Sequence, residues 1–255
     1  MKHLSRRHFA RDMLGTLLAY SLVRGLDAGQ ALAAPAGREA RRWLLEVEEM
    51  CAGLRGGKLR PAEWRHKVEE LFGRVDLADL LRTIDYDALA GNALFPEDHD
   101  SALALELPPV EGAAAGELAY VPFFIALKRG RAIAPHAHKN MASMHMVIKG
   151  EARVRHFDRV SDEPTHLTLR PTLDKTFGRG GLSTVSDEQA GNVHWFKALS
   201  EAVFIFSVGV FKINPDEDFT GRDFLDPAGG ERLAGGLVRA RRITYAEARA
   251  FYGNT

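Results

Sequence analysis

Two kinds of hydrophobic pattern divide the chain. Between residues 37 and about 90, apolar side chains recur at the three- and four-residue spacing of amphipathic helices. From residue 117 onward the apolar runs are short, and clusters of Gly, Pro and Asp separate them. Many short strands at even spacing are typical of a β-sandwich or β-barrel. The pattern therefore predicts a mainly β domain with an N-terminal helical layer packed against it.

Breaks in the helical region divide it into three expected helices. Gly56-Gly57 ends the first, Pro61 suits the first turn of the second, and Asp76 can cap the third. Cys51 lies on the apolar face of the first helix, which indicates a core residue and not a nucleophile. The apolar faces comprise Trp43, Leu44, Val47, Met50, Cys51 and Leu54, then Trp64, Val68, Leu71 and Phe72, then Leu77, Leu80 and Leu81.

The rest of the chain is expected to form strands and one final helix. Residues 91–116 contain Pro108-Pro109 and Gly112 and are typical of a connecting loop. A final helix is expected between a capping box, Thr244 with Glu247, and a stop at Gly253. The expected strands are Tyr120–Leu127, Ala132–His138, Met144–Lys149, Ala152–Val160, His166–Leu169, Leu182–Val185, Val193–Ala198 and Val203–Phe211.

Composition and charge narrow the function classes. The 255 residues have a formal net charge of zero, so the basic stripe typical of nucleic-acid binding is not expected, and we predict no nucleic-acid partner. A single cysteine cannot form a disulfide within the chain or a multi-cysteine zinc site. The ten histidines are therefore the metal-capable residues of interest.

The first 34 residues have the features of an export signal. Arg6-Arg7, flanked by Ser5 and Phe9, precede a short apolar run from Met13 to Val23, and small residues follow at 31–34. This pattern resembles a twin-arginine signal peptide, with an ordinary secretory signal as the alternative. The run is shorter than the roughly 20 residues that span a bilayer, so no stable membrane anchor is expected. We therefore predict passage through the twin-arginine export machinery to a periplasmic or otherwise exported location.

Histidines in two expected strands form a possible metal site. His136 and His138 are two residues apart, so in a strand their side chains point to the same face. Both imidazoles can then reach one ion at roughly 2.0–2.1 Å. A second block, from Gly191 to His194, lies on a later strand.

These two blocks resemble the metal-binding motifs of the cupin superfamily. The first motif has a glycine, an H-x-H pair, a glutamate and a glycine, and the second contains G-x2-H. The chain matches both, but Ser143 stands in place of the glutamate. The resemblance implies a cupin barrel over residues 91–255 with a three-histidine site at His136, His138 and His194. The matching positions are Gly130, His136, His138, Gly150, Gly191 and His194.

A narrower resemblance is to the cysteamine dioxygenase and plant cysteine oxidase family. It rests on residues 135–160, PHAHKNMASMHMVIKGEARVRHFDRV, on Asn192-Val193-His194 and on Gly221-Arg222-Asp223. Those enzymes are three-histidine iron dioxygenases that convert a thiol to a sulfinate with O2. The chain departs from them at Phe224, where a cysteine is common, and at Trp195. The resemblance thus gives stronger support for Fe(II) as the bound metal than for a thiol as the substrate.

Other polar residues near these motifs have more than one possible role. His145 could be a fourth ligand, a proton relay, a neighbour of the ligands or a packed core residue. Asp158 could orient a ligand or be a solvated charge at a strand end. Arg155, with Arg153 on the same strand face, could bind a substrate carboxylate or be exposed on the barrel surface. We take His145, Asp158 and Arg155 as candidate catalytic residues.

Four further residues near the motifs have no assigned catalytic role. Tyr120 and Trp195 could line a pocket or pack in the core, and His156 and His166 are expected on the surface or barrel wall.

The sequence supports one main functional hypothesis and two alternatives. The main one is an exported non-haem iron dioxygenase that uses O2 on a small substrate, of which a thiol is one. The first alternative is a periplasmic metal- or ligand-binding cupin without catalysis. The second is a three-histidine cupin that uses another divalent metal (Mn, Zn or Ni), with zinc or manganese serving hydrolysis or isomerisation.

Overall fold

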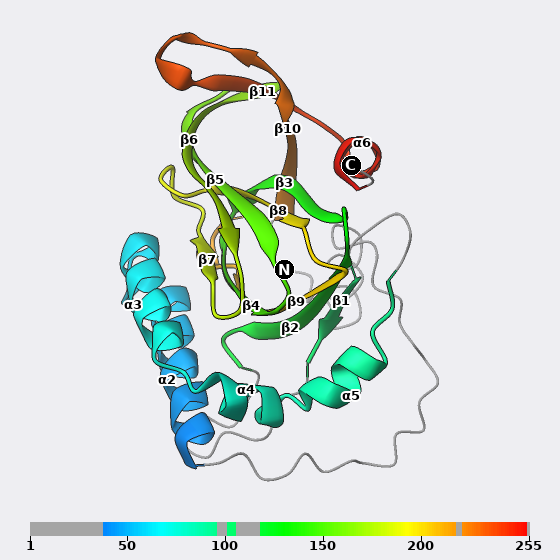
Figure 1. The fold of residues 1–255 in the computed structure, drawn as a ribbon. Coiled ribbons are helices and arrows are strands. Elements are labelled where there is room, and N and C mark those ends of the chain that lie inside the picture. The colour runs from blue at the N-terminus through cyan, green and yellow to red at the C-terminus, as the bar shows by residue number, and fades with distance from the viewer. Residues whose placement is uncertain (1–37, 96–100, 106–117, 218–220, 254–255) are drawn as a thin grey trace, which may run out of the picture.

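The computed structural model describes residues 38–95, 101–105, 118–217 and 221–253 (Figure 1). The expected signal peptide, residues 1–34, lies outside the described residues. Within the described part of the chain, no helix combines the length and the apolar character needed to cross a membrane.

Two antiparallel sheets form the body of the molecule. The first sheet has five strands in the order β1-β2-β9-β4-β7, and we call it the helix-covered sheet. The second has six strands in the order β10-β11-β6-β5-β8-β3 and closes on itself as a barrel. We call it the histidine sheet. The first comprises β1 Ser101–Ala104, β2 Val121–Lys128, β4 Met141–Lys149, β7 Leu182–Val185 and β9 Ala202–Phe211. The second comprises β3 Ala132–Lys139, β5 Ala152–Asp162, β6 His166–Phe177, β8 Val193–Ala198, β10 Gly221–Arg232 and β11 Val238–Arg242.

The N-terminal helices cover one face of the helix-covered sheet (Figure 1). They are α2 Arg38–Arg55, α3 Pro61–Gly73, α4 Leu77–Thr83 and α5 Tyr86–Gly91. The predicted breaks are confirmed: α2 ends before Gly56-Gly57, Pro61 begins α3, and the Asp76 carboxylate accepts hydrogen bonds from the backbone at the start of α4. Cys51 is fully buried, and burial raises the pKa of its thiol. The predicted fold class is confirmed in its mainly β character, its closed antiparallel barrel and its N-terminal helical layer.

The space between the two sheets has an apolar half and a polar half. Ile125, Val147 and Ile205 of the helix-covered sheet pack against Ile133, Val154 and Phe196 of the histidine sheet. Further along the same strands the inward residues become histidine and serine, and all of these except the half-buried His156 are buried. The change to polar residues coincides with a register shift in the β3–β8 pairing between Ile133 and His136.

Several strands differ from the expected ones. β1 lies within the segment predicted as a loop, β6 continues to Phe177 beyond the predicted Leu169, and β10 and β11 were not predicted. The β10 sequence contains Pro227 and Gly229-Gly230, which are ordinarily turn residues, and its pairing with β11 is irregular between Asp226 and Glu231. The capping box at Thr244 is confirmed, and it begins α6 Tyr245–Tyr252, which packs beside β3 and β10.

Candidate metal centre

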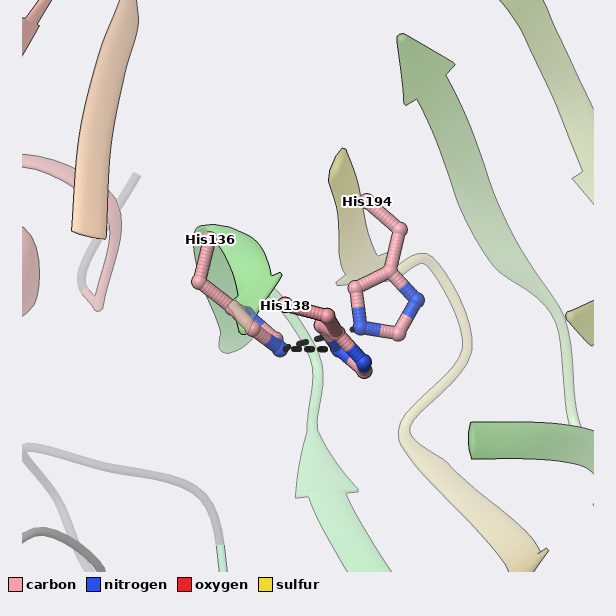
Figure 2. A group of neighbouring side chains, drawn as sticks. All are labelled: His136, His138 and His194. Carbon is pink, nitrogen blue, oxygen red and sulfur yellow. Dashed lines mark hydrogen bonds between the residues drawn. The ribbon is translucent and has the colours of Figure 1, made fainter. Parts of the chain in front are cut away.

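Three histidines from two neighbouring strands meet inside the barrel. His136 and His138 lie on β3, and His194 lies on β8 directly opposite His136 in the antiparallel register. All three are at most 1% exposed. The Nε2 atom of His136 lies 3.1 Å from that of His138 and 3.1 Å from that of His194 (Figure 2). The ligand-capable atoms of the three residues all lie within 4.8 Å of one another.

The surroundings keep these imidazoles neutral. Burial lowers the pKa of all three well below the ordinary value, and the nearby charge of Arg222 lowers the pKa of His136 and His138 further. The Nδ1 atom of His136 lies 2.8 Å from the carbonyl oxygen of Ala134, so Nδ1 carries the proton and donates. Its Nε2 lone pair is therefore directed at the other two rings, as in metal-ligating histidines.

The donor set fits a divalent metal ion. Three neutral nitrogen donors converge in a buried place, and two close Nε2–Nε2 contacts bring lone pairs together unless a proton or a cation lies between them. Neutral imidazole suits Fe, Zn, Cu and Ni, and three protein ligands leave positions open for other groups. The three predicted ligands are thus brought together as a site that could hold a metal.

Hydrogen bonds from several other segments hold the tight turn before His194. Asn192 donates through Nδ2 to the carbonyl oxygens of His138 and Ser186 at 2.9 Å each, which ties the two ligand strands together. The Asp158 carboxylate accepts the Gly191 N–H at 2.8 Å. Asp158 therefore positions this turn, and no hydrogen bond joins it to the histidine ligands in the described structure.

The N-terminal layer also reaches this turn. Arg65 of α3 donates through Nη1 to the carbonyl oxygen of Ala190 at 2.6 Å. Gly191 has φ +62°, and a Cβ atom there would lie 2.5 Å from Arg65 Nη1. The positive φ favours glycine at this position, and an added methyl group would also displace the flexible end of Arg65.

The opposite wall of the site comes from β4 of the helix-covered sheet. The His145 ring centroid lies 4.8 Å from that of His194 and 5.3 Å from that of Phe196. Burial, followed by the charges of Arg222 and His156, lowers the pKa of His145 to about 3. His145 thus neighbours the ligands, outside the group of three. Ser143, two residues earlier, has a buried hydroxyl that finds no hydrogen-bond partner among the described residues.

Two residues near the site were not assigned a role from the sequence. Arg222 of β10 lies directly opposite His138 of β3, so both side chains are on the same face. The Nε atom of Arg222 is buried and has no hydrogen-bond partner within the described part of the chain. His156 of β5 lies opposite His194, and its Nε2 is 2.6 Å from Ser183 Oγ. The sequence shows the motif Gly221-Arg222-Asp223, but it does not show that this motif pairs with β3.

Arg155 lies away from the metal site. Side chains alternate along β5, and since His156 faces His194, Arg155 faces the other side. Its Nε donates to Asp174 at 3.0 Å, and its guanidinium lies 4.4 Å from the centroid of the Trp195 ring. A role for Arg155 at the histidines is therefore not compatible with its position. Tyr120 packs against the N-terminal helices.

Comparisons with known proteins add little to these observations. No family model matches the chain, and no curated protein matches it.

Solved structures resemble the chain only weakly. A cupin superfamily protein from Desulfitobacterium hafniense is 11% identical over 48% of this chain and 87% of that chain, with a TM-score of 0.32. A recombinant oxalate oxidase in complex with glycolate is 17% identical over 48% of this chain and 55% of that chain, with a TM-score of 0.33. Procruciferin, an 11S globulin from Brassica napus, is 17% identical over 37% of this chain and 21% of that chain, with a TM-score of 0.30. These similarities carry no argument about activity.

Proposed function

We propose that this protein is an exported non-haem iron dioxygenase that acts on a small substrate, with thiols as the first class to test. The observation that carries the proposal is the set of three neutral, converging imidazoles at His136, His138 and His194 without a carboxylate among them. Ser143 stands where a cupin glutamate would complete the ligand set, and a serine hydroxyl is a poor ligand. An ion held by the three histidines would therefore keep coordination positions for two groups from outside the protein, O2 and the substrate.

Each neighbouring residue has a task in this proposal. A redox-active ion such as Fe(II), held by the three imidazoles, would supply the activation of O2. Arg222 places a positive charge on the same face as His138, which favours a substrate that binds as an anion, such as a thiolate. Asp158 and Asn192 hold the His194 turn, and the buried histidine His145 bounds the site from the opposite sheet.

The proposal is tested by oxygen uptake. Protein purified under anaerobic conditions and loaded with Fe(II) should consume O2 when a panel of small thiols is added, and mass spectrometry should detect a sulfinic acid. His138→Ala should abolish the uptake, whereas Ser143→Ala should retain bound metal. A fully iron-loaded protein that consumes no O2 with any thiol would point to a non-thiol substrate or to the binding-protein alternative.

Export is a separate part of the proposal. It rests on the arginine pair Arg6-Arg7 ahead of a short apolar run. Replacing both arginines with lysine should leave full-length precursor in the cytoplasm. Normal processing of that double variant would contradict the twin-arginine route and would leave the metal site untouched.

A further inference from the structure

A cleft lies on the outer face of the histidine sheet, behind the three histidines. It has a volume of about 280 Å³ and is bounded by β5, β8, β10 and α6. Its strand residues alternate with His156, His194 and Phe196, which point inward, so the sheet separates the cleft from the three histidines. The lining residues are Arg153, Arg155, Trp195, Lys197, Ala228, Phe251 and Tyr252.

The cleft contains more positive charge than its own carboxylate compensates. Asp174 accepts from Arg153 at 2.6 and 2.8 Å and from Arg155 at 3.0 Å, so one carboxylate serves two guanidinium groups. Lys197 lies directly opposite Arg153 in the strand register and has no ion-pair partner among the described residues. Like charges directly opposite each other destabilise a sheet. Asp226, which accepts a hydrogen bond from the lining residue Tyr252, supplies a second carboxylate beside the cleft, so these groups together carry one net positive charge.

Aromatic rings form the other walls of the cleft. The Trp195 and Tyr252 rings meet edge to face with centroids 5.0 Å apart, and Arg155 lies over the Trp195 ring. The Tyr252 hydroxyl donates to Asp226 at 2.5 Å and accepts from the Ala228 N–H at 3.1 Å, which fixes this ring in place. Phe251 is 43% exposed at the end of α6. The cleft thus combines fixed aromatic surface with unpaired positive charge.

We propose that this cleft binds a small aromatic carboxylate. The carboxylate would be held by Lys197 and by the guanidinium nitrogens of Arg153 and Arg155 that Asp174 leaves unused, and the ring would lie against Trp195 and Phe251. Arginine can hold a carboxylate through two parallel hydrogen bonds, and planar rings stack on Trp at small cost in conformational freedom. A volume of about 280 Å³ is near the lower end for ligand pockets, which limits the ligand to a single ring.

Benzoate is the probe, used with the metal-loaded protein. Its binding should be measured by calorimetry and by the fluorescence of Trp195, since Trp43 and Trp64 are 6% and 0% exposed. We expect benzoate to bind, and we expect benzyl alcohol, which lacks the charge, and acetate, which lacks the ring, to bind at least about tenfold more weakly. Acetate binding as tightly as benzoate would overturn the proposal, because a simple cluster of cations would explain it.

Four variants test where the probe binds. Lys197→Gln should weaken benzoate binding about tenfold, and Phe251→Ala should also weaken it. Lys128→Gln, a matched exposed lysine on the other sheet, should leave it unchanged. His138→Ala removes a metal ligand; this variant and the wild type, compared without metal, should bind benzoate equally. Benzoate affinity that is unchanged in both Lys197→Gln and Phe251→Ala, in proteins with wild-type circular dichroism, would overturn the proposal, as would its loss in His138→Ala.

Discussion

The three ligand residues owe their convergence to strand alternation and to one register. His136 and His138 share a face because they are two residues apart on β3, and His194 joins them because β8 pairs with β3 at that point. The first relation can be read from the sequence. The second became predictable only through the resemblance to cupin motifs, because strand register is a long-range property.

Removal of one imidazole should therefore be costly for metal binding. We expect His194→Ala to weaken the binding of a divalent ion by about two orders of magnitude or more, since even the loss of a residue that only supports a ligand costs 10- to 100-fold. Ser143→Ala should bind metal as the wild type does. Metal content after dialysis, measured by mass spectrometry, checks both. Loss of metal in Ser143→Ala with retention in His194→Ala would place the site elsewhere.

Buried neutral histidines should also make the metal-free protein sensitive to acid. Burial, then the charge of Arg65, lowers the pKa of His156 to about 4, whereas an unfolded histidine titrates near 6.5. Between these values the unfolded state binds a proton that the folded state does not, so stability falls as the pH falls from about 6.5 to about 4. His156 alone should contribute on the order of 3 kcal/mol to this loss.

Urea denaturation of metal-free protein at pH 7.5 and pH 5 measures this effect. His156→Gln should reduce the difference in unfolding free energy between the two pH values. His66→Gln, at an exposed position on α3, should leave the difference as in the wild type. An equal pH dependence in His156→Gln and wild type would show that His156 does not carry it.

At the scale of elements, the conformation of the turn that leads into β8 depends on one residue, Gly191. Gly191 combines a φ of +62° with the close approach of Arg65, and Gly180, in the turn between β6 and β7, has φ +84° with open space around it. Gly180→Ala should therefore cost only the backbone strain, about 1–2 kcal/mol. Gly191→Ala should cost more, because the added methyl group also displaces Arg65.

The two glycine variants should differ in metal affinity as well as in stability. Gly191→Ala is expected to weaken metal binding because the displaced turn carries His194 three residues later, whereas Gly180→Ala should bind metal normally. Thermal unfolding and metal titration of both proteins test this. Equal metal affinity in the two variants would mean that the turn does not position His194.

The elements that the sequence missed share a physical cause. β10 contains Pro227 and a glycine pair, so its local composition favours a turn, and pairing with β3 and β11 overrides that preference. Arg222 was consequently left without a role, because only the β10–β3 register places it opposite His138. Helix ends were predictable because Asp76 and Thr244 cap their helices through local hydrogen bonds.

At the scale of the whole molecule, the helical layer and the barrel share one core. Phe72 of α3 packs between Trp43 of α2, at a ring-centroid distance of 4.6 Å, and Phe206 of β9, at 6.2 Å. Glu48 of α2 accepts the Ala119 N–H ahead of β2, and Glu69 of α3 accepts the Thr184 hydroxyl of β7. Neither part buries its apolar surface without the other.

Phe72→Ala should therefore destabilise the metal site together with the helices. We expect a loss of about 3–5 kcal/mol, as for other buried Phe→Ala changes, and a single unfolding transition in which helical circular dichroism and metal release change together. Leu94→Ala, at a residue 53% exposed, should have little effect. Helices that melt well before the metal is released would show two independent units.

The pairing of β3 with β8 and β10 has a consequence for how the protein forms during synthesis. β3 is completed early, but its two neighbours are drawn from residues 193–198 and 221–232, near the end of the chain. Contacts so distant in sequence form slowly, and a chain still on the ribosome presents His136 and His138 without their third partner. A metal ion held by all three histidines would therefore be captured only after residues 193–198 have been synthesised, and its selection would take place in whichever compartment the barrel closes.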